Sequence, residues 1–240
     1  MAYLVFIHGA GEDGRTWDEQ VVGFKAQHRV LAVTLPGRHT REGEPALTSH
    51  ADNARDVIAQ MDAAGYRKPV VVVGHSMGGG VALMLALEHA DRLTGLVLVC
   101  TGARMTMAPE FMDRARALAE SGRGGQAVPL ERLIPAKASP AVRAWLKARV
   151  MSASAETTLA DFEANNGFDV MERLTEIKTP TLVVGGEADT MAPPKFAEFL
   201  AQKIEGAQLV VLPNCGHYPQ VEQSAKFDEA LEDFVDSLSG

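Results

Sequence analysis

The feature that most constrains this chain is the apolar run Pro69-Val70-Val71-Val72-Val73, which leads directly into Gly74-His75-Ser76-Met77-Gly78. A fully apolar strand that stops at Gly-x-Ser-x-Gly and continues as a helix is the sequence form of a nucleophile elbow, a sharp strand-to-helix turn with a serine at its tip. Glycines flank the serine because such a turn is strained, and neighbours without a Cβ let it close. The pattern predicts that Ser76 projects above a sheet, close to the N-terminus of the following helix.

Short apolar runs alternate along the chain with segments of helical spacing. The runs carry no polar alternation, as in strands buried on both faces of a parallel sheet; they cover residues 3–7, 30–33, 70–73, 96–99, 182–184 and 209–212. The helical candidates are 17–24, 49–63, 79–89, 194–204 and 224–238. This order predicts an α/β fold: a doubly wound, mostly parallel sheet of about six strands with helices on both faces.

The alternation of strand and helix patterns is interrupted at residues 104–176, which contain helical patterns and no strand-like run. Helices are expected at 109–119, ended by the glycines of 122–125, at 140–150, capped by Ser139, and at 154–165, capped by Ser154 and followed by a turn at Asn166-Gly167. The expected organisation is a core of residues 1–103 and 177–240 with a helical lid, residues 104–176, inserted in it.

Serine is a weak nucleophile unless a base and a group that orients the base lie nearby. His217 follows the last predicted strand, whereas His89 belongs to the helix after the turn and faces away from Ser76. After the preceding strand, Asp189 and Glu187 compete for the role of the acid, and Asp189 lies further into its loop. We therefore predict a catalytic triad of Ser76, Asp189 and His217, in the chain order Ser, Asp, His of α/β-hydrolases. Some hydrolases keep the acid one strand earlier, but residues 100–103 contain no carboxylate.

These motifs resemble the α/β-hydrolase superfamily, in the branch of small esterases, lactonases and cofactor-free haloperoxidases. The resemblance covers nearly the full length through four motifs: His8-Gly9-Ala10-Gly11, Gly74-His75-Ser76-Met77-Gly78-Gly79, Gly186-Glu187-Ala188-Asp189 and Gly216-His217. One departure is that members of this branch usually begin with a β-hairpin before the His-Gly strand, and here that strand opens the sequence.

The resemblance implies a serine esterase that forms an acyl-enzyme. Ser76 would attack the acyl carbon, His217 would take and return the proton, and Asp189 would fix the imidazole tautomer. The backbone N–H groups of Ala10 and Met77 would form the oxyanion hole. The expected substrates are carboxylic esters of small to medium, mainly apolar molecules, with no cofactor and no metal.

The same residues fit several other functions less well. Gly9-Ala10-Gly11-Glu12-Asp13-Gly14 also fits the dinucleotide fingerprint Gly-x-Gly-x-x-Gly, but the next strand ends without the acid that would bind a ribose. Ser76 at the elbow excludes hydrolases that use an aspartate nucleophile, and no histidine or cysteine pair has metal-ligand spacing. Lactone or C–C bond hydrolysis on the same triad, and a non-catalytic ligand-binding receptor of the same fold, stay open.

The predicted substrate pocket is mostly hydrophobic. Methionine and aromatic side chains of the expected lid and of the catalytic loops would line it, with Met105, Phe111, Trp145, Phe162, Met191 and Tyr218 as the candidates. Arg104 and Arg123 are the candidates for holding a substrate carboxylate, although solvation at the surface is the expectation for both.

Charge and composition exclude several partners. The net charge of −8 argues against a nucleic-acid surface, and the acidic stretch 222–236 is expected to be a solvated helix face. No apolar stretch is long enough for a bilayer and no signal peptide is seen, so no membrane partner is expected. Cys100 and Cys215 are the only cysteines and are expected to be free buried thiols in a cytoplasmic protein. The oligomeric state stays open.

Overall fold

The computed structural model of the protein describes residues 1–122, 127–134, 138–150 and 152–238. A single sheet of six parallel strands forms its centre, in the order β2-β1-β3-β4-β5-β6. The strands are β1 (Tyr3–Ile7), β2 (Arg29–Ala32), β3 (Val70–His75), β4 (Leu93–Val99), β5 (Thr181–Gly186) and β6 (Gln208–Leu212). The predicted α/β sheet is confirmed. Strands are added toward one edge from β1 to β2 and toward the other edge from β3 onward, and open parallel sheets bind ligands at such a switch between β1 and β3.

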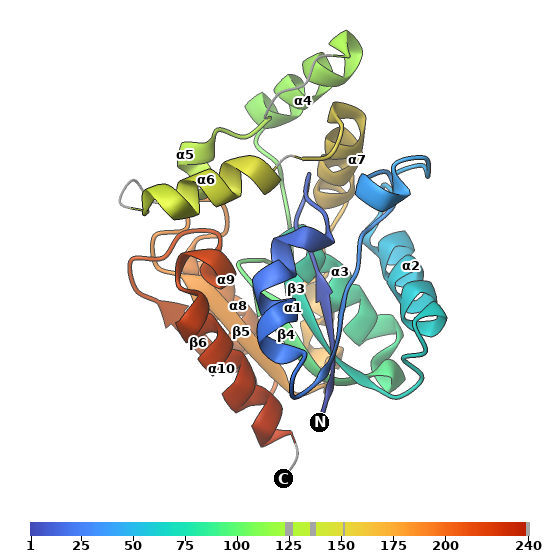
Figure 1. Cartoon of the computed structure of the whole chain (residues 1–240), viewed down its shortest axis with the longest axis vertical. Coiled ribbons are helices and arrows are strands. Elements are labelled where there is room, and N and C mark those ends of the chain that lie inside the picture. Colours follow the sequence, from blue (N-terminus) through green and yellow to red (C-terminus); the bar gives the residue numbers. More distant parts are fainter. Residues whose placement is uncertain (123–126, 135–137, 151, 239–240) are drawn as a thin grey trace.

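Helices cover both faces of the sheet (Figure 1). On one face α1 (Asp18–Phe24) and α10 (Ser224–Ser237) share an apolar cluster with Leu4 and Phe6 of β1. On the other face α2 (His50–Ala63), α3 (Met77–Glu88) and α8 (Pro194–Lys203) pack with Val5 and Ile7. Successive residues of β1 therefore point to opposite cores, which explains why its sequence shows no polar alternation.

Most predicted elements shift by only one to three residues. β4 begins at Leu93, before the predicted start, because Leu93 and Gly95 pair with β3 although Thr94 and Gly95 interrupt the apolar pattern. α3 begins at Met77 directly after the turn and is buried almost all round. None of the helices in the described ranges has both the length and the apolar character needed to span a bilayer.

The segment 104–176 is helical between β4 and β5, as its pattern predicts. It contains α4 (Pro109–Ser121), α5 (Leu130–Leu133), α6 (Pro140–Arg149), α7 (Ala155–Asn166) and the 3-10 helix η4 (Met171–Glu176). Ser139 and Ser154 cap α6 and α7 through their side chains, and Gly122 ends α4 in a left-handed conformation. The glycines expected at 124 and 125 lie outside the described residues.

The two ends of this segment run side by side. Arg104 and Asp169 form an isolated antiparallel bridge, and backbone hydrogen bonds join Met105 N–H to Phe168 O (3.1 Å) and Val170 N–H to Ala103 O (2.8 Å). In Figure 1, α4 to α7 lie together beyond one end of the sheet. Their own apolar cluster, which includes Phe111 and Phe162, also contacts Tyr218 and Ala10 from the loops after the strands. The segment thus sits over the carboxyl ends of the strands.

Candidate active site

Ser76 sits at the tip of the turn between β3 and α3. Its backbone has φ 52° and ψ −116°, a conformation that an L-residue adopts only under constraint. Its N–H donates to Val99 O (2.9 Å), and the Thr101 hydroxyl donates to its carbonyl (2.8 Å). A Cβ on Gly78 would lie 2.4 Å from Ile7 O, so the turn closes only with glycine there. The sequence reason for the flanking glycines therefore holds.

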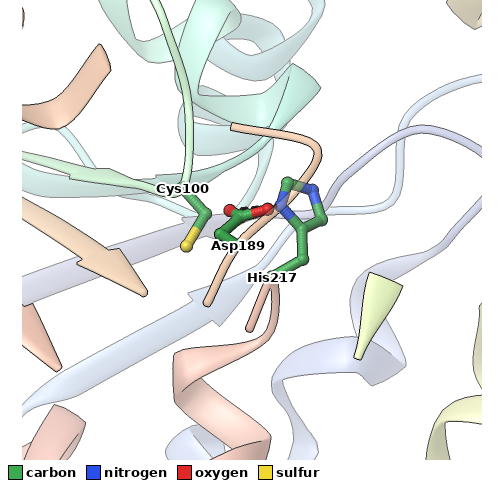
Figure 2. Close-up of side chains that lie close together, drawn as sticks. All are labelled: Cys100, Asp189 and His217. Atoms are coloured by element: carbon green, nitrogen blue, oxygen red, sulfur yellow. Dashed lines mark hydrogen bonds and ion pairs between the residues drawn. The ribbon is translucent and has the colours of Figure 1, made fainter. Parts of the chain in front are cut away.

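His217 and Asp189 meet from the loops after β6 and β5 (Figure 2). His217 Nδ1 and Asp189 Oδ2 are 2.8 Å apart, and both side chains are buried. Because the carboxylate accepts, Nδ1 carries the proton and Nε2 keeps its lone pair. The other carboxylate oxygen accepts the N–H groups of Met191 (2.8 Å) and Ala192 (3.0 Å), which fixes its orientation. Glu187, the rival acid, accepts the N–H of Asn214 instead.

The pair changes the acidity of both groups. Burial works to raise the pKa of Asp189, but the facing imidazole and the two backbone N–H groups hold it below its usual range. Burial likewise works to lower the pKa of His217, and the negative charges of Asp189, Glu12 and Glu222 raise it above its usual value. The imidazole is therefore a stronger base than a free histidine.

The loop after β1 carries Ala10 between two glycines whose N–H groups are hydrogen-bonded. His8 is buried and neutral, its pKa lowered to about 3 by desolvation and then by Arg38. Its Nε2 accepts the N–H of Leu35 (3.1 Å), so Nδ1–H donates to Gly9 O (2.8 Å). Gly9 N–H donates to Glu12 (3.2 Å) and Gly11 N–H to Asp161 (2.7 Å).

Two backbone donors near Ser76 are left available by this arrangement. Within the described part of the chain, the N–H groups of Ala10 and Met77 have no hydrogen-bond partner, although both neighbours of Ala10 are bonded. Met77 is the first residue of α3, whose first-turn N–H groups have no partner inside the helix. These are the two groups that the sequence predicted for an oxyanion hole.

One buried and one half-buried carboxyl group, both missed by the sequence reasoning, hold these loops. Glu12, 1% exposed, accepts the Tyr218 hydroxyl (2.5 Å) and thereby ties the β1 loop to the His217 loop. Glu222 accepts the N–H groups of Gly216 (2.9 Å) and Tyr218 (3.0 Å), so the expectation of a solvated acidic face is wrong at this residue. Burial raises the pKa of both carboxyls. Their sequence context carries no signal that separates them from surface acids.

A buried ion pair joins the segment 104–176 to the β1 loop. The Arg38 guanidinium donates to both carboxylate oxygens of Asp161 in α7, at 2.7 and 2.8 Å, with side chains 1% and 0% exposed. Asp161 also accepts Gly11 N–H, and Arg38 donates to Glu12 O (3.3 Å). The loop that carries Ala10 is therefore positioned partly by α7.

A cavity of about 560 Å³ opens at Ser76 and His217. Its walls are largely apolar side chains of segment 104–176 and of α8. Three predicted pocket residues line it, Met105, Phe111 and Met191, and so does Arg104. Arg123 lies outside the described residues.

The other three predicted pocket residues do not line this cavity. Phe162 is 1% exposed and packs inside the cluster of segment 104–176, and Trp145 lies under the Arg149 guanidinium at 4.5 Å. Tyr218 is buried with its hydroxyl on Glu12. The apolar pattern of this segment marks buried side chains but does not tell a helix–helix contact from a cavity wall.

Figure 2 shows a third group beside the pair, the Cys100 thiol at the end of β4. Atoms of Cys100, Asp189 and His217 that could bind a metal ion lie within 4.8 Å of one another. Nδ1 is already bonded to the carboxylate, and burial, followed by the charge of Asp189, raises the pKa of the thiol well above its usual value. Because metals bind the thiolate, these residues fit a carboxylate–imidazole pair better than a metal ion.

The chain matches known proteins over almost its whole length. It is 28% identical over 247 residues to a pimeloyl-[acyl-carrier protein] methyl ester esterase of Neisseria meningitidis, covering 98% of this chain and 94% of that protein. An esterase from Thermogutta terrifontis has a similar structure, with a TM-score of 0.87, 27% identity and coverage of 99% and 90% of the two chains. For an enol-lactonase from Burkholderia xenovorans the TM-score is 0.85 and the identity 28%, covering 98% and 91%. Residues 4–230 match the alpha/beta hydrolase family, and the chain belongs to that family.

Proposed function

We propose that this protein is a serine hydrolase that cleaves carboxylic esters through a Ser76–His217–Asp189 triad and an acyl-enzyme. The observation that carries the proposal is that one cavity is lined both by the strained Ser76 and by His217, whose ring is oriented by Asp189 at 2.8 Å. The named esterases among the relatives, each matched over nearly the full chain, support ester cleavage.

Each residue has a defined part in this chemistry. His217 Nε2 accepts the proton of the Ser76 hydroxyl as its oxygen attacks the ester carbonyl, and the same proton passes to the leaving alcohol. Asp189 keeps Nδ1 protonated and stabilises the imidazolium. The N–H groups of Ala10 and Met77 donate to the carbonyl oxygen as its negative charge grows. His217 then takes a proton from a water molecule, whose oxygen attacks the acyl-enzyme carbonyl. The same proton returns to the Ser76 oxygen as it leaves, and the carboxylic acid is released.

The helical segment 104–176 acts, in this proposal, as a lid that supplies the substrate-facing wall. Met105, Met107 and Phe111 from this segment line the cavity together with Phe199 of α8, and these side chains suit an apolar acyl or alcohol group of small to medium size. A lactone is a cyclic ester and needs no further group. The enol-lactonase of similar structure therefore makes lactone hydrolysis the second candidate.

Labelling with a fluorophosphonate probe tests the nucleophile. The wild-type protein is expected to label and to hydrolyse p-nitrophenyl butyrate, and Ser76→Ala is expected to do neither. Ser224→Ala, at the start of α10 and away from the cavity, is the matched control and keeps both activities. A wild-type protein that neither labels nor hydrolyses esters and lactones would rule out the proposal, and labelling that persists in Ser76→Ala would assign the nucleophile elsewhere.

A further inference from the structure

The cavity beside Ser76 has a charge pattern opposite to that of the protein as a whole. The chain carries a net charge of −8, yet among the described residues the cavity lining includes Arg104, Arg132 and Lys195 and no aspartate or glutamate. All three side chains are exposed, so they stand where the cavity opens to solvent. Deeper walls are apolar. A molecule that fills this cavity would meet carbon surface inside and positive charge outside.

Arg132 is placed by the two catalytic loops themselves. The hydroxyl of Thr190, the residue after Asp189, donates to Arg132 O at 2.8 Å. The backbone N–H of His217 donates to the next carbonyl, Leu133 O, at 3.0 Å. The Arg132 guanidinium lies over the ring of Phe111 at 5.9 Å, and no carboxylate pairs with it in the described part of the chain. The catalytic loops thus hold its backbone, and its charged side chain lines the cavity without an ion pair in the described part of the chain.

Lys195 occupies an unfavourable position for a lysine. It lies in the first turn of α8, which contains no acidic residue, so its charge opposes the positive end of the helix dipole. Among the described residues no carboxylate compensates it, and its ammonium lies over the ring of Phe196 at 5.7 Å. Arg104 differs, because Asp169 lies 3.8 Å from its guanidinium. Among the described residues that line the cavity, Arg132 and Lys195 are therefore the cations without an ion pair.

We propose that the substrate is an amphipathic ester that carries an anionic group, a carboxylate or a phosphate, at the end of an apolar chain. Arg132 and Lys195 bind the anion at the cavity mouth, Phe111 and its apolar neighbours contact the chain, and the scissile carbonyl lies at Ser76. This inference rests on the proposed ester hydrolysis and adds the class of ester. The two cations act on specificity and not on the chemical step.

Paired substrates of equal length test the anion site. Monomethyl esters of linear dicarboxylic acids are compared with the dimethyl esters of the same acids, and methyl ω-phosphonooxyalkanoates separate phosphate from carboxylate. The monoanionic esters are expected to have the higher kcat/KM, and this preference should fall with added salt because the cations are exposed. The anion, carboxylate or phosphate, that gives the larger increase in kcat/KM over the neutral ester identifies the group that the site binds.

Charge-removing variants assign the preference to the two residues. Arg132→Gln and Lys195→Gln are each expected to lose about three- to fivefold in kcat/KM on the anionic ester, as for an exposed ion pair, mainly through KM. Each variant should therefore lower the ratio of kcat/KM on the anionic ester to kcat/KM on p-nitrophenyl butyrate. Lys147→Gln removes one exposed charge of α6 outside the cavity and is the matched control.

The outcomes separate the two proposals. Hydrolysis of the neutral esters with no preference for the anionic ones, or equal losses in Lys147→Gln, overturns the anion site and leaves the esterase standing. Absence of turnover on every ester overturns the proposed function and this inference with it.

Discussion

The buried pair Arg38–Asp161 allows a stability test whose sign is set by the structure. Arg38→Met leaves the Asp161 carboxylate buried with only Gly11 N–H as a partner, and Asp161→Leu leaves a guanidinium that is 1% exposed without a counter-charge. Each single change should lower the free energy of unfolding by about 3–5 kcal/mol, the usual cost of leaving one buried charge unpaired.

The double variant Arg38→Met/Asp161→Leu should be more stable than either single variant. Both charges are then absent, and the remaining losses are the hydrogen bonds of the buried Gly11 N–H and of the Pro36 and Glu12 carbonyls. A buried group left without its partner costs about 1–3 kcal/mol. Urea unfolding curves of the four proteins give a coupling free energy of several kcal/mol. The exposed pair Lys178–Glu205 is the control, and its double-mutant cycle should give about 1 kcal/mol or less.

Activity measured on the folded double variant then reports on the β1 loop. Because Gly11 loses its acceptor, Ala10 N–H is held less firmly, and kcat should fall while KM changes little. The loss should stay below the roughly hundredfold or greater effect of removing an oxyanion donor outright. Additive free energies in the Arg38–Asp161 cycle would refute the reasoning on stability, and an unchanged kcat would refute the link between α7 and the oxyanion loop.

Three further predictions concern the triad and the turn. Asp189→Asn should lower kcat by about 10⁴-fold because the imidazole then takes the wrong tautomer. The Cys100 thiol lies within 4.8 Å of the pair, so adding Cys100→Asp to this variant should restore part of the lost kcat. An equally inactive double variant would show that the end of β4 cannot supply the acid. The pH profile of kcat/KM on p-nitrophenyl butyrate should fall on the acid side with a midpoint above about 6.5, because His217 acts as a base only when neutral and its pKa is raised. Glu222→Gln removes a negative charge near His217 and should move that midpoint to lower pH. A move to higher pH would contradict the assignment of His217 as the base. Gly78→Ala should abolish soluble active protein because its Cβ would lie 2.4 Å from a backbone carbonyl oxygen. The control Gly23→Ala, in α1 with open space around it, should raise the free energy of unfolding by about 0.5–1 kcal/mol. A Gly78→Ala protein with the thermal melt and the hydrolysis rate of the wild type would show that the turn is not closed as described.

The fold could be predicted from the sequence because each layer of the structure has its own pattern of apolar residues. Strands buried on both faces appear as continuous apolar runs, and helices that cover them show helical spacing, so the order of elements followed directly. The strained turn at Ser76 was also predictable, since only glycine at positions such as 78 lets it close. Asp189 and His217 could be proposed because parallel strands bring the loops after them to one edge.

The parts that could not be predicted depend on contacts between distant residues. Glu12 bonds Tyr218 across 206 positions and Arg38 bonds Asp161 across 123, and no local pattern announces either pair. Phe162 failed as a pocket residue for a related reason: an apolar side chain in a helical insertion packs wherever the tertiary contacts place it. The positive charges at the cavity mouth come from single residues on separate elements, and no sequence motif marks them.

The paired ends of segment 104–176 have a consequence for how such a scaffold can diversify. Because Arg104 and Asp169 are neighbours, the residues between them form a loop that could be exchanged as a module at two crossover points without altering the sheet. Its length would matter little, since doubling a loop costs only about 0.6 kcal/mol of closure free energy. A transplanted module must nevertheless bring a carboxylate for Arg38, or Arg38 must be replaced with it. Compatibility between donor and recipient thus depends on contacts far from the crossover points, of which this charge pair is the most demanding.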